Sequence, residues 1–210
     1  MSSYIAAVLC ALVLLILAVG LGIGIALIVV RRREAKRKAE LAAAPKDPFA
    51  DLDSDILRGD PRALKAGDIF DTHGETLTVR GSLRLKQGGY YWSEHLIDTG
   101  EGVKRWLSVE EDPDLELYLW TSVTDTVPAP GPKTIEYDGK RFSSKESGRA
   151  RYTSEATTGL GPSGNLSYHD YEAADGSRLS YEDFDDTGRS EVALGLRILR
   201  NEITIYPQSP

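Results

Sequence analysis

Residues 115–120 read LELYLW, and this short stretch decides the fold class. Its leucines stand at every second position and alternate with a glutamate, a tyrosine and a tryptophan. Successive side chains of a β-strand point to opposite faces, so the alternation predicts a strand with one apolar face. The same period of two returns at Val192, Leu194, Leu196 and Ile198. The stretch therefore predicts strands that cover a core on one side.

Similar runs continue in both directions along residues 61–207. Gly88-Gly89 precedes an aromatic run from Tyr90 to Ile97, and TGEG at residues 99–102 precedes the next apolar run. Because such turn signals recur about every ten residues, the pattern is typical of antiparallel sheets and not of βαβ units. We expect a mainly β domain over residues 61–207.

The predicted β-domain contains an internal repeat of low sequence identity. Repeat one covers about residues 61–124 and repeat two about 133–207, with Gly74 matching Gly139 at the first turn and Trp92 opposite Tyr168 at a later strand. Each unit is too small to close a core alone, so we expect two similar β-repeats packed face to face about a pseudo-twofold axis. The alternative, that any two β-meanders resemble each other, remains open.

A different pattern occupies the N-terminus. Residues 4–30 carry no charge, and RRREAKRK follows at residues 31–38. At about 1.5 Å rise per residue this run would span about 40 Å, which exceeds a bilayer core of about 30 Å. A cleaved signal peptide is the alternative, but the opening MSSY has no basic residue and the apolar run is too long. We expect one retained transmembrane helix after a short outward N-terminus, residues 1–3.

The basic flank predicts the orientation. Residues 31–40 hold six basic and two acidic side chains, so the positive-inside tendency keeps the C-terminal side in the cytoplasm. We expect a basic helical stalk over residues 31–44, ended by Pro45, and an acidic linker over residues 45–60. The expected location is the plasma membrane, with the N-terminus outside and the β-domain cytoplasmic.

Charge and cysteine content exclude several functions. The whole chain has a net charge of −7. Residues 61–210 carry a net charge of −8, because the stalk contributes +4 and the linker −3. An acidic domain is a poor nucleic-acid binder, since that role needs a basic surface. The single cysteine, Cys10, excludes an intrachain disulfide. Within the apolar run, Gly20 and Gly24 have the spacing of a helix-packing motif, which makes this face a candidate for self-association through the transmembrane helix.

No catalytic, cofactor-binding or metal-ligating residue is expected, and whether the domain is an enzyme stays uncertain, leaning towards no. The histidines, His73, His95 and His169, lie in no metal-ligand spacing. His95 and His169 occupy nearly equivalent places in the two repeats and are expected to be partly exposed. Glu94 and its neighbour His95 cannot share a site, because strand neighbours face opposite ways. The acidic run at residues 110–114 could hold a divalent cation, but such a turn is usually solvated.

The aromatic residues are the stronger candidates for a binding surface. They concentrate in the first repeat, and aromatic and arginine side chains are enriched at interfaces. If one strand face is uncovered, the candidate partner surface consists of Tyr91, Arg105, Trp106 and Trp120.

Several of these stretches resemble a known family. DPRAL followed by GD (residues 60–68), VRGSL (79–83), YWSEHLID (91–98), RWLSVEED (105–112) and LELYLW look like the uncharacterised bacterial domain of unknown function DUF 4178. Membrane-anchored actinobacterial members are similar in layout. The resemblance implies no catalytic residue. It suggests a membrane-associated complex, because family members tend to be encoded near small membrane proteins, envelope-stress components and aminopropyltransferase-like proteins.

Two hypotheses follow. The preferred one is a single-pass, non-catalytic binding or scaffold module that recruits an unidentified protein partner in a membrane-associated complex, for example an envelope-stress complex. The alternative is a ligand-sensing or enzymatic domain with a small-molecule pocket between the two β-repeats, for a small cation given the acidic balance. No cofactor is expected under the preferred hypothesis.

Overall fold

The structure, a computed structural model, describes residues 54–98, 102–185 and 187–208. The expected transmembrane helix with Gly20 and Gly24, the stalk and the start of the acidic linker lie outside the described residues. Among the helices that the structure does describe, none is long and apolar enough to cross a membrane. The end of the predicted linker forms the short helix α2, Ser54–Arg58.

Nearly every other described element is a strand, which confirms the mainly β, antiparallel prediction. Short 3-10 turns lie at Pro61–Ala63 and Arg200–Glu202. The first five strands are β1 Ile69–Thr72, β2 Glu75–Gln87, β3 Tyr90–Asp98, β4 Arg105–Glu111 and β5 Leu115–Ser122. The others are β6 Thr134–Tyr137, β7 Lys140–Ala156, β8 Ser163–Ala173, β9 Arg178–Phe184, β10 Arg189–Ile198 and β11 Ile203–Tyr206.

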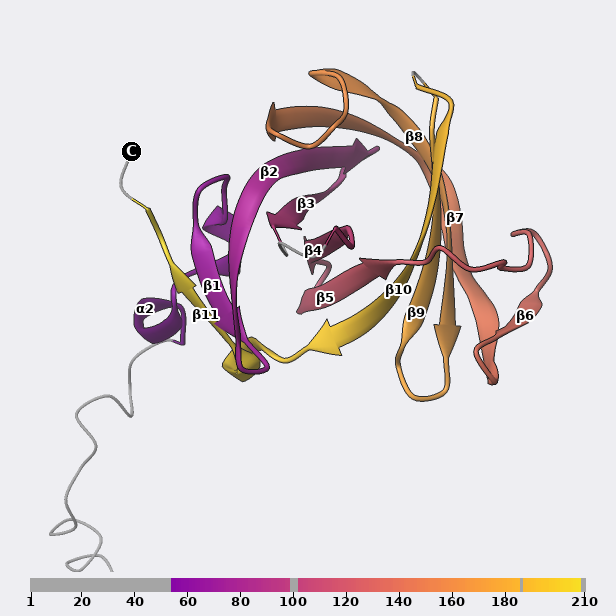
Figure 1. Cartoon of the computed structure of the whole chain (residues 1–210), viewed down its shortest axis with the longest axis horizontal. Coiled ribbons are helices and arrows are strands. Elements are labelled where there is room, and N and C mark those ends of the chain that lie inside the picture. Colours follow the sequence, from indigo (N-terminus) through magenta and orange to yellow (C-terminus); the bar gives the residue numbers. More distant parts are fainter. Residues whose placement is uncertain (1–53, 99–101, 186, 209–210) are drawn as a thin grey trace, which may run out of the picture. The chain divides into compact units, whose positions relative to one another are not determined.

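Eight of these strands close into an antiparallel barrel. The sheet order is β11-β1-β2-β3-β4-β5-β10-β9-β8-β7-β6, and an additional pairing joins β2 to β7. That pairing closes the ring from β2 to β7, while β1 and β11 extend it on one side and β6 on the other (Figure 1). The closed ring removes the free edges that an open sheet of this size would expose.

The strand order divides into two meanders of the same plan, β1 to β5 and β6 to β10. Each meander begins with a hairpin of a four-residue strand and a long one, turning at His73-Gly74 in the first and Asp138-Gly139 in the second. All four turn residues have positive φ, as a type I′ hairpin turn requires. The expectation of face-to-face packing needs correction, because the meanders join edge to edge through β5–β10 and β2–β7.

A bulge in β2 places side chains of this one strand in two different hydrophobic cores. The register against β3 shifts between Val79 and Gly81, which exchanges the faces of the residues on either side. Val79 therefore belongs to a core outside the barrel, packed under β1, β11 and the first 3-10 turn, whereas Leu83 belongs to the barrel interior. A third cluster lies on the outer face of β8 to β10, beside Ile135 and Phe142.

Candidate functional site

The barrel interior is apolar at one end and polar at the other. Leu83, Leu85, Ala150, Leu166 and Phe184 are buried together and fill the apolar end. Towards the β2–β3 turn the inward positions become acidic and aromatic instead. The interior of an eight-stranded barrel is just wide enough to hold side chains or one small ligand. The apolar side chains fill one end of this barrel and close the bottom of a cavity at the opposite end.

That cavity has a volume of about 410 Å³, within the range of small-molecule sites. Its mouth is marked by exposed residues of its lining, among them Tyr90, Asp112 and Glu146. The lining residues come from both meanders and are Gln87, Tyr90, Trp92, Glu94, Trp106, Ser108, Glu110, Asp112, Trp120, Glu146, Tyr168, Asp170, Arg178, Ser180, Glu182, Glu191 and Ala193.

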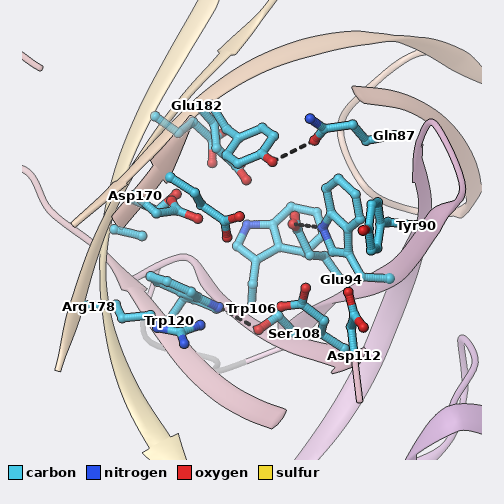
Figure 2. Close-up of a pocket in the computed structure, with 17 residues that line it drawn as sticks. Gln87, Tyr90, Glu94, Trp106, Ser108, Asp112, Trp120, Asp170, Arg178 and Glu182 are labelled. Atoms are coloured by element: carbon cyan, nitrogen blue, oxygen red, sulfur yellow. Dashed lines mark hydrogen bonds between the residues drawn. The ribbon is translucent and has the colours of Figure 1, made fainter. Parts of the chain in front are cut away.

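All three tryptophans of the protein line this cavity. The Trp92 ring meets the Tyr168 ring edge-on, with centroids 6.0 Å apart. The Trp120 Nε1–H donates to Ser108 Oγ at 2.8 Å, which fixes the orientation of that indole. Figure 2 shows Trp106 between Asp170 and Glu182 on one side and Glu94 and Asp112 on the other. Aromatic faces therefore alternate with carboxylates around the cavity wall.

Six carboxylates of the wall have no ion-pair partner among the residues that the structure describes: Glu94, Glu110, Asp112, Glu146, Asp170 and Glu182. Glu94 accepts a hydrogen bond from Trp92 Nε1 at 3.0 Å. Asp170 Oδ1 is buried and accepts no hydrogen bond from the described part of the chain. An unsatisfied buried acceptor is costly, so this oxygen marks a place where a donor is missing.

Burial raises the pKa of Glu94, Asp170 and Glu182. Desolvation raises the pKa of Glu94 to about 7. The hydrogen bond from Trp92 lowers this pKa, and repulsion from Asp170 raises it. Desolvation likewise raises the pKa of Asp170 to about 7. The pKa of Glu182 lies well above its ordinary value because of desolvation and of repulsion from Glu94 and Asp170. Shifts of this size are a property of functional sites as well as of buried networks.

The cations near the cavity are already engaged. Lys104 Nζ pairs with Glu191 and lies 4.9 Å from the centre of the Trp106 ring. Arg178 binds Glu116 at 2.7 Å and Glu172 at 3.2 Å. Neither cation forms an ion pair with Glu94, Asp170 or Glu182 within the described part of the chain. The free charge of the cavity wall is therefore negative.

In residues 54–98, 102–185 and 187–208, no group of three or more histidine, cysteine, aspartate or glutamate side chains is arranged to hold a metal ion. Aromatic faces with dispersed carboxylates are instead suited to an organic cation, which the rings attract through cation–π contact.

The model of one family, described as a domain of unknown function (DUF4178), matches residues 65–200. The chain belongs to this family. Uncharacterized proteins of Mycobacterium tuberculosis and Mycobacterium bovis are each 37% identical to it over 185 residues, which cover 84% of this chain and 88% of the relative. No solved structure gives a significant match. The match to DUF4178 includes all eight barrel strands and runs from the approach to β1 to just beyond the end of β10.

Within this DUF4178 domain, the structure separates the four residues of the candidate partner surface. Trp106 and Trp120 point into the cavity, and only 6% of Trp106 is exposed. Tyr91 lies outside, 63% exposed, with Lys86 Nζ 5.0 Å from its ring centre. Arg105 also lies outside and pairs with Glu75 at 2.8 Å. The four therefore do not form one surface, because neighbours on a strand face opposite ways.

The histidines of the DUF4178 domain lie outside the cavity. His95 is fully buried, which corrects the expectation of a partly exposed residue, and hydrogen-bonds Ser82 Oγ at 2.8 Å and Ser93 Oγ at 3.0 Å. Burial lowers its pKa to about 3. His169 is half-buried, as expected, and stacks on Tyr171. As expected from strand geometry, Glu94 faces the cavity and His95 faces away.

Sequence reasoning missed most of the DUF4178 cavity, including Glu94, Asp170 and Glu182. One signal was present: Glu94 and Asp170 sit beside the two histidines that occupy nearly equivalent places in the repeats. The carboxylates, not the histidines, are the pair that the fold brings into one cavity. Trp92 and Tyr168, also matched between the repeats, meet there as well.

Proposed function

We propose that the DUF4178 barrel is a non-catalytic binding module that takes a small organic cation into its interior. The observation that carries the proposal is a cavity of about 410 Å³ walled by all three tryptophans and by carboxylates without ion-pair partners. A cation would restore the ionised form of these carboxylates and fill the space between the aromatic faces. This develops the small-molecule alternative drawn from the sequence.

The contacts support binding better than catalysis. A nucleophile needs an adjacent base and access to substrate. In the described residues, the Ser82–His95 pair has that adjacency, but both side chains are fully buried on the outer face of the barrel. The cavity itself holds carboxylates, aromatic rings and serines, with no histidine in its wall.

Intrinsic fluorescence tests the binding proposal directly, because every tryptophan of the chain is in the cavity wall. The full chain in detergent micelles would be titrated with organic ammonium ions, with sodium chloride at matched ionic strength as the control. We expect saturable changes in emission with the amines alone. If no ammonium ion changes the emission or the melting temperature, the proposal fails.

We further propose that residues 4–30 anchor the chain in the plasma membrane, with the barrel on the cytoplasmic side. The uncharged run and its basic flank support this proposal. Alkaline carbonate should leave the full chain in the membrane pellet, whereas deletion of residues 4–30 should release it. In intact cells, an impermeant maleimide should label Ser3→Cys and spare Ser147→Cys. The reverse labelling pattern would overturn the orientation.

Recruitment of a protein partner is a second candidate function, supported by Tyr91, which lies outside the cavity and is 63% exposed. Co-purification from native membranes should then lose a partner with Tyr91→Ala. A Gly20→Leu and Gly24→Leu double variant would test self-association of the membrane segment in a membrane two-hybrid assay. Unchanged association in either experiment would remove that part of the proposal.

A further inference from the structure

The carboxylates of the cavity wall form one cluster. Glu94 on β3 pairs in register with Ser108 on β4, so Glu94 and the next inward residue of β4, Glu110, are diagonal neighbours. In the second meander, Asp170 on β8 and Glu182 on β9 are diagonal neighbours in the β8–β9 register. Long side chains at such positions are within reach of one another. The acidic side chains of each meander therefore lie side by side.

Asp170 links the acidic side chains of the two meanders. Beyond desolvation, the negative charge of Asp170 raises the pKa of Glu94, on the other meander, and of Glu182, on the neighbouring strand. Beyond desolvation, Glu146 and Glu110 in turn raise the pKa of Asp170. Like charges therefore repel one another throughout the cluster, and one positive charge beside Asp170 would relieve that repulsion.

Asp170 also has an oxygen without a donor. Its carboxylate accepts a hydrogen bond from the Ser180 hydroxyl, but Oδ1 is buried and accepts none within the described part of the chain. Figure 2 shows the Asp170 carboxylate directed into the cavity. Because a buried acceptor without a donor is costly, a ligand that donates to Oδ1 gains more than a ligand that supplies charge alone.

Two hydrogen-bond donors next to this cluster are directed at other acceptors. Tyr168, the inward neighbour of Asp170 on β8, donates its hydroxyl hydrogen to Gln87 Oε1 at 2.5 Å. The Trp92 Nε1–H donates to Glu94 at 3.0 Å. Neither donor serves Asp170 Oδ1, so a bound molecule is a suitable source of that hydrogen bond.

Two classes of organic cation suit an aromatic cavity with negative charge, and they differ in their N–H groups. A quaternary ammonium is attracted to the rings by its charge and has no hydrogen to donate. A protonated primary amine has the same charge and, like the lysine ammonium, three N–H donors. The unpaired oxygen of Asp170 and the carboxylates around it are acceptors, so they favour the primary amine.

We propose that the occupant is a protonated primary amine whose ammonium group donates to Asp170 Oδ1 and whose apolar body lies against the tryptophan rings. This inference rests on the proposed cation-binding function and names the class of cation. Trp106, which Figure 2 shows next to Asp170 and Glu182, is the ring nearest to the ammonium position.

Two cations of equal shape test the inference. Protonated tert-butylamine and tetramethylammonium have the same number of heavy atoms, the same tetrahedral shape and the same charge, but only the first has N–H donors. Tryptophan emission of the full chain in micelles would be followed with each cation at constant pH and ionic strength. We expect protonated tert-butylamine to bind about tenfold more tightly, or more, since it gains a hydrogen bond to a charged acceptor.

A variant of Asp170 locates the hydrogen bond. Asp170→Asn keeps the shape of the side chain and removes its charge, so the tenfold preference should fall to about threefold, because a charge-assisted hydrogen bond is roughly twice as strong as a neutral one. The matched control is Asp112→Asn, the same exchange at an exposed position of the cavity lining, which should leave the preference unchanged. Circular dichroism and a urea midpoint would establish folding of both variants. The comparison of the two cations on the unaltered chain needs neither variant.

The outcomes distinguish this inference from the function on which it rests. Equal affinity for the two cations, or a preference for tetramethylammonium, overturns the primary amine while cation binding stands. A preference that Asp170→Asn leaves unchanged overturns the assignment of the ammonium group to Asp170. The absence of any response to either cation overturns both the inference and the proposed function.

Discussion

Individual carboxylate side chains determine the charge of the barrel cavity. Glu94 and Glu182 line the barrel cavity, and no cation in the described part of the chain forms an ion pair with them. Burying a charge in this way costs stability, so the carboxylates respond by taking up protons. The same property makes them receptive to a cation.

The first prediction concerns Glu94→Gln. The folded pKa of Glu94 is raised to about 7, so the folded state binds more protons than the unfolded state between about pH 4.5 and 7. Stability from this group is present at low pH and is lost as pH rises, up to about 3 kcal/mol. Glutamine keeps the acceptor for Trp92 Nε1 and should raise the free energy of unfolding at pH 8 but not at pH 4.5. Urea denaturation at both values measures this.

The control for Glu94→Gln is Glu136→Gln, at an exposed carboxylate of β6, which should leave the free energy of unfolding unchanged at either pH. An equal gain for Glu94→Gln at pH 4.5 and pH 8 would contradict the electrostatic cause.

The second prediction concerns His95 and has the opposite sign. Burial lowers its folded pKa to about 3, below the ordinary value of 6.5, so its contribution to stability is present above pH 6.5 and is lost as pH falls. His95→Gln should cost about 1–3 kcal/mol at pH 7.5, because the hydrogen bonds to Ser82 and Ser93 are disturbed, and should flatten the acid side of the stability profile. His73→Asn, in an exposed turn, is the control. A profile of unchanged slope would refute the assignment to His95.

Among the elements, β2 has the largest structural role. It pairs with β1, β3 and β7, and its bulge moves its side chains from the outer core to the barrel interior. At Gly81 the chain of β7 comes so close that an added Cβ would lie 2.4 Å from the carbonyl oxygen of Thr157. The barrel can therefore close only if the residue at position 81 lets the two backbones approach this closely, as glycine does.

The third prediction follows from that contact. Gly81→Ala should force β2 and β7 apart and destabilise the barrel by about 1–3 kcal/mol or more, because backbone atoms cannot yield as a flexible side chain does. Gly89→Ala in the β2–β3 turn, where an added Cβ meets nothing within 4 Å, is the matched control. Melting curves followed by far-ultraviolet circular dichroism compare the two. Equal melting temperatures would show that the β2–β7 pairing tolerates the added methyl.

The strands themselves were predictable, and the cavity was not. Alternation at residues 115–120 predicted β5 and the glycine turn predicted the β2–β3 hairpin, because period and turn chemistry are local. The inward or outward direction of Trp106 and Trp120 depends on which strand face becomes the barrel interior. Only closure decides that, so both aromatic residues were assigned to a surface when they line a cavity.

At the scale of the whole molecule, the two meanders together enclose the barrel cavity. Each contributes carboxylates and aromatic rings, and neither encloses the cavity without the other. A cation bound there would contact both halves, so its binding should stabilise the closed barrel by mass action.

The fourth prediction is that cation binding strengthens with pH. Glu94 and Asp170, whose pKa values are raised to about 7, lose protons between pH 5.5 and 8. A cation prefers the ionised carboxylates, so an organic ammonium ion such as protonated butylamine should bind more tightly at pH 8 and should release protons on binding near pH 7. Tryptophan titration at the two pH values measures the first effect. Calorimetry in two buffers of different ionisation enthalpy measures the second, and a pH-independent affinity would contradict this prediction.

The amino-acid sequence by itself determined the β class, the antiparallel turns, the family resemblance and the expectation of a membrane anchor. These follow from local periodicity, turn residues and a long uncharged run, which need no tertiary contact. Tertiary structure alone decided that β2 meets β7, that the two meanders join at their edges, and that Glu94 and Asp170 face one cavity. The reason is physical: strand alternation specifies two faces, but the pairing of distant edges decides which face encloses the interior.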